Sequence, residues 1–93
     1  MIVSIKHKGL RLFWEQGDPS KLPQAYLKRI DETLDLLHRV HDLHEIRQLR
    51  TYRLHALSGK LRNYWAVTVS GNDRIIFRFE NQNVYLLDYL DYH

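Results

Sequence analysis

The spacing of apolar residues changes once along this 93-residue chain, and that change limits the folds it can adopt. In residues 23–42 four aliphatic side chains recur at steps of three, four and three, which is the spacing of one helix face. They are Leu27, Ile30, Leu34 and Leu37. After Arg50 the period falls to two, as in residues 64–69 and 74–79, which is typical of half-buried strands. The sequence therefore predicts helices in the first half and a sheet in the second.

The flanking segments complete the order β-α-α-β-β-β-β. Gly17 is expected to end a first helix, Ser70-Gly71-Asn72 is typical of a hairpin turn, and residues 80–83 form a second turn. We expect strands at 2–6, 52–54, 64–69, 74–79 and 84–90, and helices at 7–16, 23–42 and, as a short turn, 43–49. The predicted fold class is α+β, with two N-terminal helices packed on one face of a mainly antiparallel sheet. Residues 1–93 make one domain.

The two faces of this sheet differ in chemistry. The helices are expected to cover the face that carries Trp65, Ile75 and Phe77, so Arg74 and Arg78 lie on the opposite face with His55 near its rim. Residues 47–79 hold seven Arg or Lys and one acid, a local net charge of +6, whereas the whole chain is +3. Concentrated positive charge on a sheet indicates an anionic partner such as a nucleic acid.

Several classes of function are excluded by composition. The chain has no cysteine, which removes disulfide, thiolate and zinc–cysteine chemistry. His38, His41 and His44 recur every third residue without completing a ligand set, so no metal and no cofactor is expected. The N-terminus lacks a signal-peptide pattern, and no apolar run approaches the ~20 residues of a membrane span. We therefore expect a soluble cytoplasmic protein without a membrane partner.

Five segments in order carry a likeness to a known family. They are Lys6-His7-Lys8-Gly9-Leu10, Tyr52-Arg53-Leu54-His55-Ala56-Leu57-Ser58-Gly59, Tyr64-Trp65-Ala66-Val67-Thr68-Val69, Asn72-Asp73-Arg74-Ile75-Ile76-Phe77 and Asp91-Tyr92-His93. The set resembles the HigB branch of the RelE superfamily, the toxins of bacterial type II toxin–antitoxin pairs. The resemblance implies an mRNA endonuclease that works in the ribosomal 30S A site. It also implies a HigA-like helix-turn-helix antitoxin, and binding to operator DNA only as the toxin–antitoxin complex.

The resemblance also assigns roles to residues. His55 matches an active-site histidine, Arg74 the phosphate-binding arginine and His93 the C-terminal histidine. Asp91 and Tyr92 match the residues that flank this histidine. Some relatives carry a catalytic lysine where this chain has Ser58, so Lys60, or else Arg62, is expected to supply the cation.

These residue types suit RNA cleavage by the adjacent 2′-hydroxyl. The reaction needs a base for the hydroxyl, cations for the phosphorane and an acid for the 5′-oxygen. His55 and His93 are the expected acid–base pair, in either order, and Arg74 the phosphate clamp, since its planar fork grips two oxygens. Metal is not required. Further contacts to RNA are expected from Arg53, Arg62, Arg78, Asp91 and Tyr92, the last by stacking on a base.

Two other interpretations fit the charge equally well. The chain is then a non-catalytic basic module that binds RNA, or a component of a DNA-binding repressor that acts only with an antitoxin. Alternatively it is a toxin inactivated by the loss of lysine at Ser58. Substitution of the histidines separates these interpretations, because a binding module tolerates it and a nuclease does not.

Overall fold

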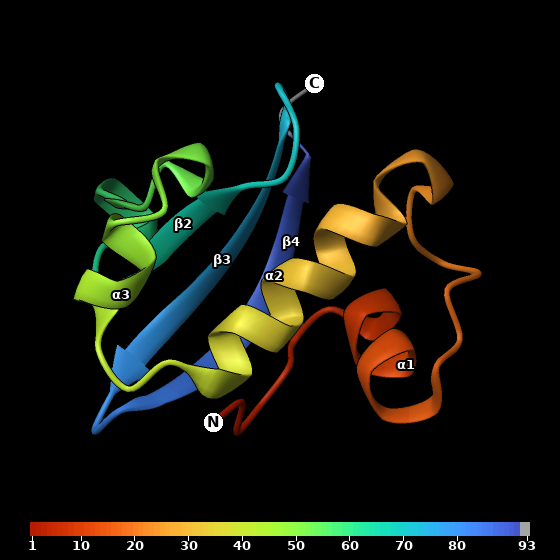
Figure 1. Ribbon diagram of the computed structural model, residues 1–93, viewed down its shortest axis with the longest axis horizontal. Helices are drawn as coiled ribbons and strands as arrows, with labels where there is room; N and C mark the ends of the chain where they lie inside the picture. Colours follow the sequence, from red (N-terminus) through yellow and green to blue (C-terminus); the bar gives the residue numbers. More distant parts are fainter. Residues whose placement is uncertain (92–93) are drawn as a thin grey trace.

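The computed structural model describes residues 1–91, which form a four-stranded antiparallel sheet covered by helices (Figure 1). The strands lie side by side in the order β1 (His55–Ala56), β2 (Trp65–Thr68), β3 (Asp73–Glu80) and β4 (Asn83–Asp91). The helices are α1 (Lys8–Gln16), α2 (Leu27–Arg39) and α3 (Leu43–Arg47), with 3₁₀ turns at Gln24–Tyr26, Arg50–Tyr52 and Gly59–Leu61. The α+β class is confirmed. No helix in this part of the chain is long and apolar enough to cross a membrane.

The ends of the helices are set by local capping. At the start of α1, Nδ1 of His7 accepts a hydrogen bond from the Leu10 N–H at 3.1 Å, and Gly17 ends the helix in the left-handed region at φ 71°. Helix α2 is shorter than predicted at both ends. A 3₁₀ turn precedes it, and the Asp42 carboxylate accepts from the His44 N–H at 2.8 Å, which starts α3 instead of prolonging α2.

The N-terminal segment, predicted as a strand at 2–6, is not a continuous one. It lies parallel to β4 through two isolated bridges, Ile2 with Val84 and Ile5 with Leu87. Between these bridges β4 contains a bulge, with Leu86 in the left-handed region at φ 53°. The Leu86 N–H donates to Oγ of Ser4 at 2.9 Å instead of to a backbone carbonyl. The bulge therefore interrupts the ladder between the segment and β4.

The prediction of a strand at 52–54 is wrong. Residues Arg50–Tyr52 form a 3₁₀ turn, and Arg53 has a positive φ of 49°, so strand pairing begins only at His55. Tyr52 and Leu54 are both buried, because the turn directs them into the core. The alternation of apolar and polar residues at 52–54 therefore reflects a turn that packs against the core, and not a strand.

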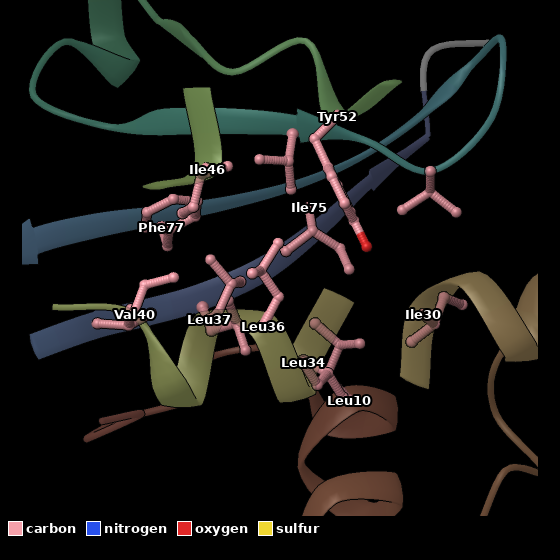
Figure 2. Close-up of a cluster of buried hydrophobic side chains, with 14 of the residues drawn as sticks. Leu10, Ile30, Leu34, Leu36, Leu37, Val40, Ile46, Tyr52, Ile75 and Phe77 are labelled. Atoms are coloured by element: carbon pink, nitrogen blue, oxygen red, sulfur yellow. The ribbon is translucent and has the colours of Figure 1, made fainter. Parts of the chain in front are cut away.

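The core lies between α2 and the helix-facing side of β3. Ile75 and Phe77 are fully buried there, and the same cluster includes Leu10 from α1 (Figure 2). Three members of the predicted helical stripe are also fully buried, namely Ile30, Leu34 and Leu37. Leu27 and Trp65 are partly buried at the margin of this cluster. The predicted covered face is thus confirmed.

Arg29 of α2 joins the helix layer to the strands that carry the opposite face. Its guanidinium donates to the Thr68 carbonyl from Nε at 3.3 Å and from Nη2 at 3.1 Å. Nη2 also donates to the Thr51 carbonyl at 3.0 Å, and the group lies 3.7 Å from the centre of the Tyr52 ring. Two carbonyls from different segments are thereby held by one side chain, which fixes the turn before β1 against the end of β2.

Candidate active site

The face of the sheet turned away from the helices carries the candidate site, and strand register sets its geometry. His55 is opposite Ala66, and Ala66 is opposite Ile76. Cross-strand partners project to the same side, as do residues two apart on one strand, so His55, Arg74 and Arg78 share this open face. Two strand spacings and two residues separate the Cα atoms of His55 and Arg74 by about 12 Å. The two side chains therefore project from the same face of the sheet.

The imidazole of His55 is held by a backbone contact. Its Nδ1 lies 2.8 Å from the Arg53 carbonyl oxygen, and the left-handed conformation of Arg53 turns that carbonyl toward the ring. A carbonyl only accepts, so Nδ1 carries the proton in this contact. The ring is exposed, which leaves Nε2 as the atom that takes or gives a proton.

The guanidinium of Arg74 folds back onto the β2–β3 hairpin. Its Nη1 donates to the carbonyls of Ser70 at 2.7 Å, Asp73 at 3.0 Å and Gly71 at 3.4 Å. These three bonds orient the guanidinium along the end of the β2–β3 hairpin. Arg74 therefore lies half-buried at one end of the open face.

The candidate loop cations follow β1. Gly59 takes a left-handed φ of 65° as the first residue of the 3₁₀ turn Gly59–Leu61, and Lys60 at the centre of this turn is exposed. Arg62 follows, also exposed. Lys60 and Arg62 thus lie two and four residues after Ser58, in the exposed connection between β1 and β2.

Arg78, on the same face, is engaged by an acid that the sequence analysis did not single out. Its Nη2 donates to Oε1 of Glu80 at 2.8 Å, while its Nε is buried and has no acceptor within the described residues. The pair borders a cleft of about 490 Å³. Residues 56–57, 62–65 and 78–80 line it. An acid two residues after a strand arginine is the only sequence signal for this arrangement, since such residues share a face.

Of the three C-terminal candidates, the described residues include only Asp91. Asp91 is opposite Asp73, and this register directs it to the helix side of the sheet, away from Arg74. Tyr92 and His93 lie outside the described residues. On the helix side the Tyr89 hydroxyl donates a short hydrogen bond to Oδ2 of Asp73, whose side chain is buried. Burial, followed by this bond and the charge of Asp73, raises the pKa of Tyr89 above its ordinary value.

Comparison with known proteins places this geometry in context. The family of RelE-like toxins of the type II toxin–antitoxin system HigB matches residues 3–93. The chain is 41% identical to Endoribonuclease HigB of Proteus vulgaris over 93 residues, which cover 100% of both proteins.

Two solved structures share the fold at low identity. A YafQ mutant from E. coli superposes with a TM-score of 0.61 at 13% identity, over 98% of this chain and 91% of that one. The YoeB/ParE toxin from Agrobacterium tumefaciens gives 0.58 at 12% identity, over 99% and 96%. The arrangement of helices and strands is therefore that of the RelE-family toxins.

Proposed function

The chain belongs to the HigB-like toxins of type II toxin–antitoxin systems, and we propose that it is an endoribonuclease that cleaves mRNA on the ribosome. The observation that carries the proposal is the shared open face of His55 and Arg74. One offers an exposed imidazole in a fixed tautomer and the other an oriented cation. The name of the relative from Proteus vulgaris supports the same chemistry.

The proposed reaction is transfer of the phosphoryl group to the neighbouring 2′-oxygen. One histidine removes the 2′-hydroxyl proton, the 2′-oxygen bonds to phosphorus, the bond from phosphorus to the 5′-oxygen breaks, and a second histidine protonates that oxygen. The products are a 2′,3′-cyclic phosphate and a free 5′-hydroxyl. His55 acts through Nε2, and His93 is its proposed partner in either order. No metal enters this route.

Cations stabilise the phosphorane in this scheme. Arg74 grips its non-bridging oxygens, and Lys60 or Arg62 takes the place of the lysine that relatives carry at the position of Ser58. Arg53 and Arg78 contact flanking phosphates or bases, with Tyr92 stacking on a base and Asp91 as a further contact. Each such phosphate contact makes binding weaker at higher salt.

The proposed partners follow from the family. An antitoxin belongs to every type II system, and we propose a HigA-like helix-turn-helix protein for this one. The toxin acts in the ribosomal 30S A site and reaches operator DNA only as the toxin–antitoxin complex. This activity takes place in the cytoplasm.

Primer extension on an mRNA in a reconstituted translation system, with and without ribosomes, tests the proposal. We expect wild type to cut only with ribosomes and Arg74→Ala to cut at least ~10²-fold more slowly, the cost of removing one preorganised donor. Arg11→Ala is the matched control, because Arg11 is an exposed arginine of α1.

Three outcomes alter the conclusion. Cleavage of free RNA keeps the nuclease and removes its dependence on ribosomes. Undiminished cleavage by Arg74→Ala removes that residue from the site. No cleavage by folded wild type under either condition leaves a basic binding module or an inactive toxin.

A further inference from the structure

The β2–β3 hairpin supplies the carbonyl groups that orient the Arg74 guanidinium, and the tip of this hairpin is exposed. The closest acceptor is the Ser70 carbonyl, 2.7 Å from Nη1, and the Asp73 carbonyl follows at 3.0 Å. Gly71 and Asn72 at the tip are both exposed. Because surface loops are usually the more mobile parts of a fold, the direction of this arginine depends on what holds the hairpin.

Asp73 makes the backbone contacts that close the hairpin. Its carbonyl oxygen accepts from the N–H groups of Val69 at 2.9 Å and Ser70 at 3.2 Å, in addition to the Arg74 guanidinium. Its own N–H donates to Oγ of Ser70 at 3.2 Å. A movement of Asp73 would therefore displace Ser70 and, with it, the carbonyls to which Arg74 donates.

The side chain of Asp73 is anchored on the other side of the sheet. It is only 5% exposed, and the hydroxyl of Tyr89 on β4 donates to its Oδ2. A buried carboxylate is costly without a hydrogen-bond donor, so this bond favours one position of the side chain. Tyr89 packs against the hydrophobic core cluster, and its ring lies 5.8 Å from that of His7, the N-cap of α1. The bond therefore connects the hairpin to the core and to α1.

We propose that Asp73 and Tyr89 are positioning residues, which hold the Arg74 guanidinium in its orientation from the opposite side of the sheet. The connection runs from the core through Tyr89 to the carboxylate of Asp73, and then through the backbone of the hairpin to Arg74. A cation that is oriented before the phosphate arrives need not reorganise during the reaction. The inference rests on the proposed function for the use that is made of Arg74.

The orientation of Arg74 is measured without RNA, by NMR of the arginine side chains. Hydrogen bonds slow the rotation of the terminal guanidinium nitrogens, so their signals should be resolved in wild type, and Arg74→Lys assigns them by their loss. We expect Tyr89→Phe to average these signals, because the Asp73 carboxylate loses its donor. Tyr85→Phe is the matched control, since this partly buried tyrosine of β4 makes no such hydrogen bond within the described residues.

Two substitutions of Asp73 test the same bond from the acceptor. Asp73→Asn should keep the Arg74 signals resolved, because its amide oxygen still accepts from the Tyr89 hydroxyl. Asp73→Ala removes the acceptor and should average the signals as Tyr89→Phe does. Circular dichroism confirms that each variant is folded, and the agreement of two independent variants separates loss of this bond from a general loss of stability.

Cleavage in the reconstituted translation system gives the second measurement. Tyr89→Phe should lower the maximal single-turnover rate by roughly tenfold to 10²-fold, the cost of a small misplacement, with the half-saturating ribosome concentration little changed. Tyr85→Phe should cut like wild type. In an Arg74→Ala background Tyr89→Phe should cause no further loss, because the residue through which it acts is absent.

The outcomes separate the inference from the proposed function. Unchanged Arg74 signals in Tyr89→Phe, or an equal loss of rate with and without Arg74, overturns the inference. A wild type that cleaves nothing, together with averaged Arg74 signals in Tyr89→Phe, upholds the anchoring of the arginine and rejects the nuclease.

Discussion

The two faces of the sheet differ in the interactions that hold their side chains. On the helix side, Ile75 and Phe77 of β3 are fully buried against residues from α1 and α2. On the open side, the alternate residues Arg74 and Arg78 are held by polar contacts to the hairpin and to Glu80. The helix side therefore carries the hydrophobic cluster, whereas the open side holds charged side chains around the buried Ala66 and Ile76. Apart from the pair of Asp73 and Tyr89, a substitution should affect stability on the first face and RNA chemistry on the second.

Truncation of the central core residue gives the largest expected effect. Phe77→Ala should lower the free energy of unfolding by about 3–5 kcal/mol, because it removes a fully buried ring and leaves a cavity. Urea titration followed by circular dichroism measures this. Arg62→Ala, at an exposed residue that lines the cleft together with Arg78 of the open side, should stay within about 0.5 kcal/mol of wild type. A comparable loss in both variants would break the distinction between the faces.

Sequence periodicity predicts the covered face well because hydrophobic burial acts through spacing alone. The positions of Ile30, Leu34 and Phe77 follow from steps of three, four and two, and the same alternation assigns Arg74 to the open side. His55 is expected only near the rim of that side, and pairing of β1 with β2 places it there. Strand boundaries near His55 are predicted poorly, since they depend on the left-handed Arg53 and on inward packing of the preceding turn. Such features arise from tertiary contacts.

The cleft likewise could not be predicted from the sequence, because it too arises from tertiary contacts. Glu80 looks like an ordinary solvated acid at a turn, and its proximity to Arg78 becomes meaningful only where residues 62–64 leave the end of β3. The role of Arg29 is equally hidden, because its carbonyl partners Thr51 and Thr68 are distant in the chain. The spacing of apolar residues along the sequence therefore predicts which face of the sheet a residue lies on. The cleft and the Arg29 contacts depend instead on where strands separate and on which residues meet across the fold.

Arg29 links helix α2 to the turn before β1 and to the end of β2. Its replacement therefore tests how far the helix layer positions the strands that carry the open face. Arg29→Gln removes charge-assisted bonds to the Thr51 and Thr68 carbonyls, so we expect a loss of about 1.5–3 kcal/mol in the free energy of unfolding. Amide hydrogen exchange should also become faster at Leu57, whose N–H bonds to the Tyr64 carbonyl beside β1.

Lys28→Gln is the control for Arg29→Gln, because this exposed neighbour on α2 makes no such contact within the described residues. Arg29→Lys should recover only part of the loss, since an ammonium cannot reproduce the planar fork over Tyr52. Unchanged exchange at Leu57 in Arg29→Gln would show that the β1–β2 pair is positioned by the core alone.

The polar pair on the helix side gives the smallest effect, and it depends on pH. Folding raises the pKa of Tyr89 above its ordinary value of about 10, through burial and the bond to Asp73, so the native state keeps a proton that the unfolded chain releases in alkali. The contribution of Tyr89 is therefore fully present below about pH 10 and declines as the pH rises above that value. Tyr89→Phe should be less stable than wild type at pH 8, and this gap should close as the pH rises through 11. Urea titrations at each pH measure this difference in the free energy of unfolding. A difference that does not change with pH would mean that Tyr89 ionises equally in the folded and unfolded states. The bond to Asp73 would then not favour the protonated form of Tyr89.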